Sequence, residues 1–322
     1  MAIKSVEIKD FLVFRGNFAA DFCSGVNVLI GGNGTGKTTL MKVMYAACNN
    51  DRHIEEFFDA AQWFKVEAKA NTYKFVVRFS NGKKFMLDYM LNEPELSSNN
   101  KLHKINPKSV YIPEKDMLSN SKGLPETVKY GKAQFNKIEI DIIKKARVLA
   151  DRPEQTLYRQ ICNVINGEPE NDGQNFFIKH PNIDKPVPFS MEASGYRKFG
   201  LLATLIRNEQ IKSGSVLFWD EPENSLNPEL APVLVDILLE LSRSGVQMFL
   251  ATHDYNFARY FDVRKDKSIP VMFHNLSKTD DGHIICNTSP EYVGLPDNLL
   301  ETASANLFKA VIANAMEIQD DE

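Results

Sequence analysis

The order of apolar and polar positions along the chain predicts an α/β protein. Short apolar runs between polar residues indicate strands, and apolar residues three or four positions apart indicate helices. The two patterns alternate in the second half, which favours a largely parallel sheet covered by helices. Strands are predicted over residues 3–8, 17–22, 26–30, 110–113, 216–219, 246–251, 271–274 and 283–287, and helices over residues 134–150, 154–166, 194–210, 228–242 and 298–316.

Two regions depart from this alternation. Residues 63–90 contain the alternating run from Tyr73 to Phe79 and then Asn81-Gly82, a pair typical of a two-residue hairpin turn. They predict an antiparallel β lobe over about 61–91. The segment over about residues 114–190 is predicted to be a helical insertion, with a short hairpin formed by residues 176–179 and 187–190. We therefore expect one domain spanning residues 1–322, with these two regions as lobes.

Composition narrows the class of protein without revealing its chemistry. Apolar residues make up 43% of the chain, charged residues 25%, and the net charge is −4, so no overall charge draws it to nucleic acid or to anionic lipid. The four cysteines lie far apart, which favours reduced thiols over a disulfide framework or a metal site. The polar N-terminus and the absence of a long apolar stretch predict a cytoplasmic protein without a membrane partner.

The segment from Gly31 to Thr38 matches G-x-x-x-x-G-K-[ST] at every fixed position. It follows the apolar run 26–30 and precedes a predicted helix, which is the context that a phosphate-binding P-loop requires. Its glycines allow backbone N–H groups to surround phosphate oxygens. Lys37 is predicted to reach the β- and γ-phosphates, and the Thr38 hydroxyl to ligate Mg²⁺. The sequence therefore predicts a site for a nucleoside triphosphate.

Two further strands end in polar residues. The run 216–219 is followed by Asp220 and Glu221, at the sheet edge where ligands of parallel α/β sheets bind. Asp220 is predicted to hold Mg²⁺, and Glu221 to orient and deprotonate the attacking water. The run 248–251 leads to His253, which is predicted to contact the γ-phosphate or to position the water. We therefore expect Glu221, His253 and Lys37 to be the catalytic residues.

A fourth motif lies at the start of the predicted helix 194–210. Ser194 is well placed to be the N-cap of that helix, and the cap alone would explain it. In the functional alternative, Ser194 and the Gly195 N–H present a phosphate-binding helix end. On the second alternative, the residues expected to bind ATP are Asn33, Gly34, Thr35, Gly36, Lys37, Thr38, Thr39, Ser194 and Gly195.

These signals, in this order, resemble the ABC-type ATPases, and within them the SMC-like, RecF-like and overcoming-lysogenization-defect-like group. The runs Ile3–Phe11 and Gly25–Gly31 resemble the N-terminal strands of that group, and Ala193–Arg197 resembles its signature motif, with Tyr196 in place of the second glycine. The resemblance implies a P-loop ATPase fold of ABC type, with ATP as substrate and Mg²⁺ as cofactor.

Two other loops match the group with departures. The segment Asn224–Pro228 falls where the group has its D-loop, but Asn227 replaces the usual acidic residue. The segment Val110–Glu114 falls roughly where a Q-loop is expected, but it supplies no glutamine. The resemblance also implies a homodimer, in which the P-loop of one copy and Ser194 of the other enclose ATP. Such a dimer forms with ATP and loosens on hydrolysis, which makes it a switch.

The resemblance leaves two functions open. The first is a sensor in a bacterial anti-phage or toxin–antitoxin-like system that controls a separate nuclease or toxin chain. It is favoured because about seventy residues follow His253 and they hold no acidic cluster for a two-metal site. The second is a repair or chromosome ATPase that acts directly on DNA, for which basic residues such as Lys74, Arg78 and Lys144 supply a surface.

Overall fold

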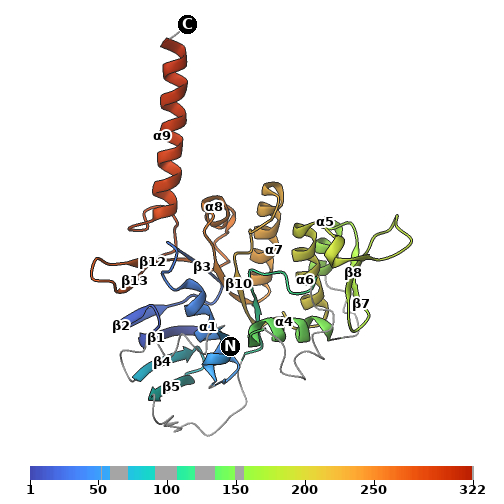
Figure 1. Cartoon of the computed structure of the whole chain (residues 1–322), viewed down its shortest axis with the longest axis horizontal. Helices are drawn as coiled ribbons and strands as arrows, with labels where there is room; N and C mark the ends of the chain where they lie inside the picture. Colours follow the sequence, from blue (N-terminus) through green and yellow to red (C-terminus); the bar gives the residue numbers. More distant parts are fainter. Residues whose placement is uncertain (52, 59–71, 91–106, 120–134, 149–155, 321–322) are drawn as a thin grey trace.

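The computed structural model describes residues 1–51, 53–58, 72–90, 107–119, 135–148 and 156–320 of the 322-residue chain. Two sheets and their covering helices contain most of these residues (Figure 1). The α/β class predicted from the sequence is confirmed. Among the described residues, no helix combines the length and the apolar character that crossing a bilayer requires.

The larger sheet has six strands in the order β13-β12-β3-β11-β10-β6. Its neighbouring strands run parallel, except that β12 and β13 pair antiparallel. The predicted mixed, largely parallel sheet is therefore confirmed. Its strands are β3 (Val26–Gly31), β6 (Ser109–Ile112), β10 (Val216–Asp220), β11 (Gln247–Ala251), β12 (Val271–Lys278) and β13 (Ile284–Ser289).

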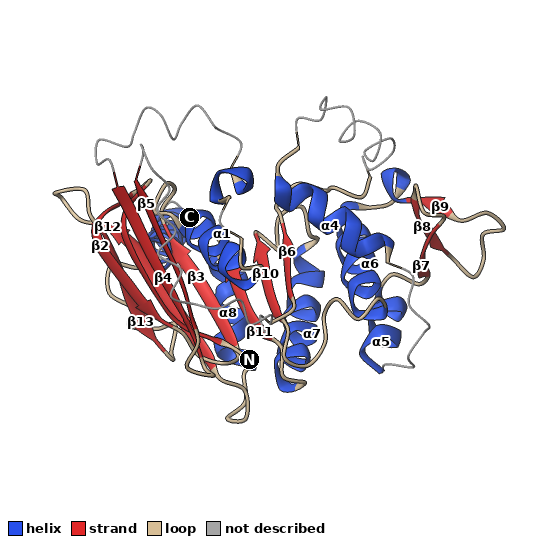
Figure 2. Cartoon of the chain, turned by 90° about the horizontal axis from the view of Figure 1, so that it is seen from below, coloured by secondary structure: helices blue, strands red, loops and turns tan. Residues whose placement is uncertain are grey.

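The central strands are apolar on both faces because helices cover both sides of the sheet. In β10, Leu217 and Trp219 point into one hydrophobic cluster, and Val216 and Phe218 point into the other. Helix α1 (Lys37–Cys48) covers the side of the sheet that Val216 and Phe218 face, and it is buried along most of its length. The opposite side, which Leu217 and Trp219 face, is covered by four helices (Figure 2): α5 (Thr156–Val164), α6 (Ser194–Arg207), α7 (Ala231–Arg243) and α8 (Tyr255–Arg264).

The smaller sheet is antiparallel and lies on the far side of α1, in the order β2-β1-β4-β5. The predicted hairpin is confirmed for residues 72–90, whereas 61–71 and 91 of that lobe lie outside the described residues. The predicted two-residue turn is wrong. The Phe79 N–H donates to the Lys83 carbonyl at 2.8 Å, so three residues form the loop, and Gly82 takes the left-handed φ of 78° that such a loop needs. The strands are β1 (Ile3–Phe11), β2 (Phe14–Asp21), β4 (Thr72–Phe79) and β5 (Lys84–Met90).

The predicted helical insertion contains a small sheet as well as helices. Helix α4 (Lys137–Arg147) begins at a capping box of Asn136 and Glu139, which is why it starts later than expected. The predicted hairpin of 176–179 and 187–190 gains a third strand, and residues 120–134 and 149–155 of the insertion lie outside the described residues. The small strands are β7 (Glu168–Asn171), β8 (Phe176–Lys179) and β9 (Val187–Pro188), and the short 3₁₀ turns are η1 (Ile54–Phe57), η2 (Phe189–Met191) and η3 (Pro228–Leu230).

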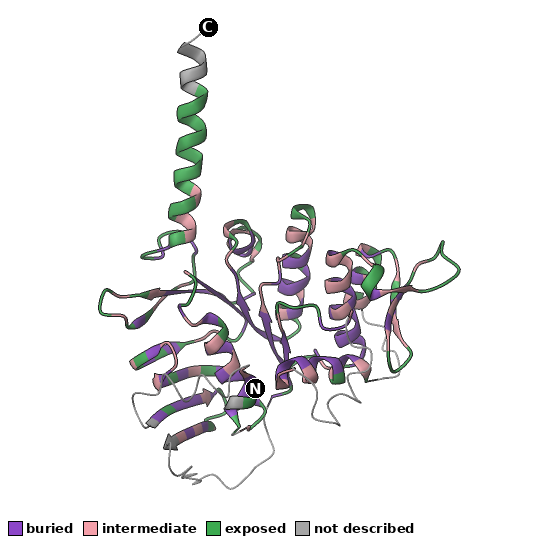
Figure 3. Cartoon of the chain, in the orientation of Figure 1, coloured by how far each residue is buried: buried purple, intermediate pink, exposed green. Residues whose placement is uncertain are grey.

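The last helix, α9 (Leu299–Asp320), extends away from the body of the molecule (Figure 1). Its residues are mostly exposed, in contrast to the buried faces of α6 and α7 (Figure 3). The sequence predicted a helix here over 298–316, and this is confirmed with a longer C-terminal end.

Candidate functional site

The P-loop joins β3 to α1 at the carboxyl edge of the six-stranded sheet. Gly34 and Gly36 have φ angles of 75° and 93°, which favour glycine. A Cβ atom on Gly36 would also come within 2.7 Å of the Phe14 and Val13 side chains. Gly36 is the N-cap of α1, and it has no side chain to cap the first turn. The first N–H groups of α1 are therefore available to bind phosphate oxygens.

The Lys37 ammonium lies over the loop that it belongs to. Its Nζ donates to the carbonyl oxygens of Gly31 at 2.9 Å and Gly32 at 3.0 Å. Burial lowers the pKa of Lys37 to about 8, although Asp220 and Glu221 act in the opposite direction. The side chain is thus a buried cation that a phosphate group would stabilise.

Asp220 ends β10 and faces the first turn of α1. Its carboxylate accepts hydrogen bonds from the Thr38 hydroxyl and from the Tyr111 hydroxyl, the latter at 3.2 Å. Burial raises the pKa of Asp220, and the two hydroxyl donors oppose that rise. Tyr111 lies on β6, directly opposite Phe218 of β10, so the pairing of the two strands fixes the position of its ring.

Glu221 and His253 follow the ends of two adjacent strands, β10 and β11. The Glu221 Oε1 and His253 Nε2 atoms are 3.9 Å apart. Burial, followed by the charges of Glu114 and Asp220, raises the pKa of Glu221, and burial with the Lys37 charge lowers the pKa of His253. A carboxylate of raised pKa beside a neutral imidazole is suited to accept a proton from water near neutral pH.

The backbone of Glu221 has a positive φ of 48°, which non-glycine residues seldom adopt. Lys198, one turn after Ser194 on α6, donates from Nζ to the Glu221 and Pro222 carbonyls, both at 3.0 Å. Burial lowers the pKa of Lys198 to about 8. Lys198 therefore connects helix α6 to the loop that carries Glu221.

The predicted N-cap role of Ser194 is wrong. The N-cap of α6 is Ala193, and the Ser194 hydroxyl donates instead to the Ser225 carbonyl at 2.7 Å. A Cβ atom on Gly195 would lie 3.1 Å from Leu226, so glycine permits the close packing of α6 on this loop. In the same loop Asn227 caps η3 by accepting from the Glu229 N–H at 3.2 Å, a role that Asn fills as well as Asp.

The structure thus brings Lys37, Thr38, Asp220, Glu221 and His253 to one sheet edge, as the order of the motifs predicted. The sequence reasoning assigned no role to Tyr111, Lys198 or Glu223. Of these three, only Glu223 could have been selected from the sequence, because it belongs to the carboxylate-rich segment 220–223. The roles of Tyr111 and Lys198 depend on contacts between distant segments.

The residues present fit a magnesium nucleotide. The P-loop offers backbone N–H groups and one lysine, and the Thr38 hydroxyl and the Asp220 carboxylate already meet beside it. Oxygen donors of this kind are those that Mg²⁺ prefers. When bound, Mg²⁺ would neutralise charge on the β- and γ-phosphates, with Thr38 and Asp220 as its protein ligands.

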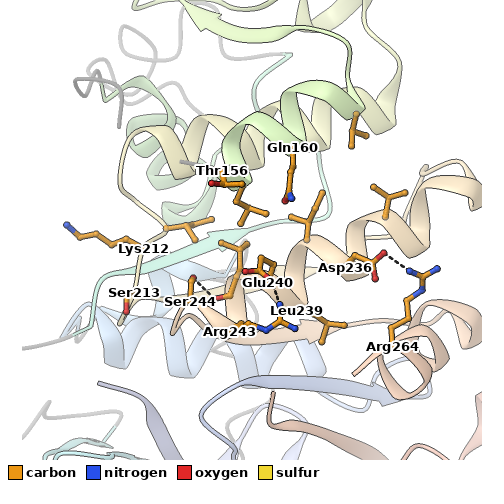
Figure 4. A pocket seen from close by; sticks show the side chains of 16 residues that line it. Thr156, Gln160, Lys212, Ser213, Asp236, Leu239, Glu240, Arg243, Ser244 and Arg264 are labelled. Carbon is orange, nitrogen blue, oxygen red and sulfur yellow. Dashed lines mark hydrogen bonds and ion pairs between the residues drawn. The ribbon is translucent and has the colours of Figure 1, made fainter. Parts of the chain in front are cut away.

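A cavity lined by described residues lies away from this sheet edge. Its volume is about 760 Å³, and it separates α5 from α7 (Figure 4). Two ion pairs, Asp236 with Arg264 and Glu240 with Arg243, stand on its wall, and none of the predicted site residues lines it. A smaller cavity of about 130 Å³ lies beside Ser194, and Glu114 and Lys198 are among its lining residues.

Comparison with protein families decides the class. A family model described as "AAA domain, putative AbiEii toxin, Type IV TA system" matches residues 26–259. The chain belongs to this family of AAA ATPases. The matched region includes the P-loop, the Asp220-Glu221 pair and His253, so the family assignment rests on the region that forms the site.

Curated proteins similar to this ATPase include a DNA replication and repair protein and ATP-binding proteins of transport systems. The DNA replication and repair protein RecF of Oenococcus oeni is 30% identical over 74% of this chain and 68% of its own length. The energy-coupling factor transporter ATP-binding protein EcfA of Methanococcus maripaludis is 22% identical over 61% of this chain and 68% of its own length. The L-cystine import ATP-binding protein TcyN of Bacillus subtilis is 31% identical, but the match spans only 25% of this chain and 35% of TcyN.

Solved structures similar to this ATPase include SMC head domains. An Smc head bound to the C-terminal winged-helix domain of ScpA has a TM-score of 0.55 at 13% identity, covering 90% of this chain and 98% of that one. An Smc head with an extended coiled coil, bound to a ScpA domain from Pyrococcus furiosus, has a TM-score of 0.51 at 12% identity, covering 96% and 99%. The expected P-loop ATPase fold of SMC-like type is therefore confirmed.

Proposed function

We propose that this ATPase is a two-state switch in which two copies enclose two ATP molecules. One observation carries the proposal. The P-loop, Asp220, Glu221 and His253 share one site, whereas Ser194 bonds to Ser225 and lines a separate small cavity. The half-buried Ser194 thus lies apart from its own P-loop, and a second copy would bring it to the γ-phosphate.

The residues divide the chemistry among them. Lys37 and the first N–H groups of α1 would bind the phosphates, and Glu221 would take the proton of the attacking water at its carboxylate. His253, 3.9 Å from Glu221 and kept neutral by burial, would hold that water or the γ-phosphate by a hydrogen bond. Loss of the γ-phosphate would remove the ligand that joins the two copies.

The molar mass in solution tests the switch. Replacing Glu221 by Gln removes the base but keeps the shape, so E221Q should bind ATP, hydrolyse it at least ~100-fold more slowly, and be a dimer by light scattering. Adding Ser194→Arg should leave ATP binding intact and return the mass to that of a monomer. Ser190→Arg, an exposed position before the motif, is the matched control and should stay dimeric. A dimer that persists in the Ser194→Arg protein would refute the shared site.

We place the switch in a bacterial anti-phage or toxin–antitoxin-like system, where it would control a separate effector chain. The description of the matched family, a putative AbiEii toxin of a type IV toxin–antitoxin system, favours this role. Cells that carry the gene with its neighbouring genes should reduce phage plaque formation, and Lys37→Ala should abolish the reduction. Equal plaque numbers with and without the gene, together with no effect on growth when the neighbouring genes are omitted, would refute the role.

A second role is supported by one comparison, the similarity to RecF of Oenococcus oeni over 74% of the chain. Under this alternative the dimer would act on DNA directly. Duplex DNA should then raise the ATP turnover of the wild-type chain, and the rise should vanish at high salt because phosphate contacts are screened. Unchanged turnover at low salt would exclude this alternative.

A further inference from the structure

Two loops carry the proposed catalytic side chains, and the loop after β11 is held from below by the sheet. Thr252, which precedes His253, is fully buried, and its N–H donates to the Leu29 carbonyl of β3 at 3.0 Å. The side chains of His253 and Glu221 are 35% and 30% exposed, so packing does not enclose them on all sides. The distance between them therefore depends on how the two loops are joined.

Glu223 is a side chain that joins these loops. It lies two residues after Glu221, and its Oε1 accepts from the Thr252 hydroxyl at 2.6 Å. The carboxylate also accepts from the N–H of His253. The Thr252 hydroxyl oxygen in turn accepts from the Asp254 N–H at 2.9 Å. One carboxylate thus holds residues 252–254, either directly or through the Thr252 hydroxyl.

The loop that carries Glu223 is itself anchored. The Glu221 N–H donates to the Ala251 carbonyl at 2.9 Å, and Lys198 donates to the Glu221 and Pro222 carbonyls. Among the acidic groups, Glu223 does most to oppose the lowered pKa of Lys198, so these two charges lie close together. A carboxylate on an anchored backbone keeps the groups that donate to it in one position.

We propose that Glu223 is a positioning residue for ATP hydrolysis, which keeps the imidazole of His253 beside the Glu221 carboxylate. The proposal rests on the catalytic roles proposed above for these two residues. Glu223 acts through the backbone of the histidine loop and not on the reacting atoms. A displacement of about 1 Å at a catalytic group can slow the chemical step ~100-fold. Loss of the link should therefore lower kcat and leave ATP affinity unchanged.

The turnover of two Glu223 variants tests the link. Methionine keeps the length of the side chain but is only a weak acceptor, so Glu223→Met should lower kcat at least ~10-fold at unchanged ATP affinity. Glutamine keeps a carbonyl acceptor, so Glu223→Gln should restore kcat to within about 3-fold of wild type. The matched control is Glu229→Met, at an exposed position, which should hydrolyse ATP like wild type. Equal kcat in the two methionine variants, or an equal loss in Glu223→Met and Glu223→Gln, would refute the proposal.

Thr252→Val breaks the same link from the other loop. Valine has nearly the shape of threonine without the hydroxyl, so kcat should again fall about 10-fold. If both substitutions act through one link, Glu223→Met with Thr252→Val should be no slower than the slower single variant. A fall by the product of the two single effects, about 100-fold, contradicts the proposal. Wild-type kcat in Thr252→Val also contradicts it, which keeps the test decisive if Glu223→Met does not fold.

A His253→Ala background separates this proposal from the roles on which it rests. His253→Ala should itself lower kcat, and adding Glu223→Met should lower it no further, because the group that Glu223 positions is gone. A further ~10-fold loss shows that Glu223 does not act through His253. If His253→Ala retains wild-type turnover, the role of His253 and this proposal both fail. If His253→Ala and Glu221→Gln are slow while Glu223→Met is not, this proposal alone fails.

Discussion

Glu223 is a buried carboxylate at the junction of the two catalytic loops. Its Oε1 accepts from the Thr252 hydroxyl at 2.6 Å, and the carboxylate also accepts from the His253 N–H. Its Oε2 has no hydrogen-bond partner among the residues that the structure describes. Burial raises the pKa of Glu223 from its ordinary 4.5 to about 7, and Asp254 adds to the rise. Replacing Glu223 by Gln keeps an acceptor for Thr252 and removes the ionisation.

The raised pKa fixes the sign of the pH effect. The folded chain holds the Glu223 proton up to about pH 7, and the unfolded chain loses it at 4.5. The contribution of Glu223 to stability is therefore present below 4.5 and is lost as the pH rises through 7. The stability of Glu223→Gln relative to wild type should grow by about 2.5 kcal/mol between pH 5 and pH 8, because one pKa unit corresponds to about 1.4 kcal/mol.

Thermal unfolding at the two pH values measures this difference. The gain corresponds to about 5 °C more in Tm for Glu223→Gln at pH 8 than at pH 5, relative to wild type. Glu229→Gln, an exposed position in the same loop region, is the control and should show no pH-dependent difference. A Tm change of equal size at both pH values would refute the reasoning, since a packing effect does not depend on ionisation.

Two further variants examine the site. Lys37→Ala should abolish ATP binding, measured with a fluorescent ATP analogue, because it removes the buried cation of the P-loop; unchanged affinity would overturn the P-loop assignment. Lys198→Met leaves the Glu221 and Pro222 carbonyls without their donor and should lower kcat about 10-fold while ATP affinity holds, with exposed Lys185→Met as control. Equal turnover in the two methionine variants would show that Lys198 does not position Glu221.

The sequence predicted the P-loop well because its structure depends on neighbouring residues. A buried strand, glycines with positive φ and a helix start are all encoded within about twenty residues, from Val26 to Ala47. The Asp220-Glu221 pair and His253 were found for a related reason. Both follow strands that are apolar on both faces, and the carboxyl ends of parallel strands meet at one sheet edge.

Predictions that depended on distant partners were less complete. Serine is a favoured N-cap residue and Ser194 stands where the helix was expected to begin. Its hydroxyl instead donates a hydrogen bond to the Ser225 carbonyl, which lies within reach. The Asn81-Gly82 pair fits a two-residue turn, but the register of β4 and β5 leaves three residues in the loop. In both cases a tertiary contact overrides the local preference.

The sequence by itself determined the class of protein, the P-loop and the order of the residues around it. Only the tertiary structure decided that Tyr111 holds Asp220 and that Lys198 holds the backbone of Glu221. The reason is physical. Local pattern fixes which face of an element is apolar, whereas the partner of that face depends on how segments far apart in the chain pack together.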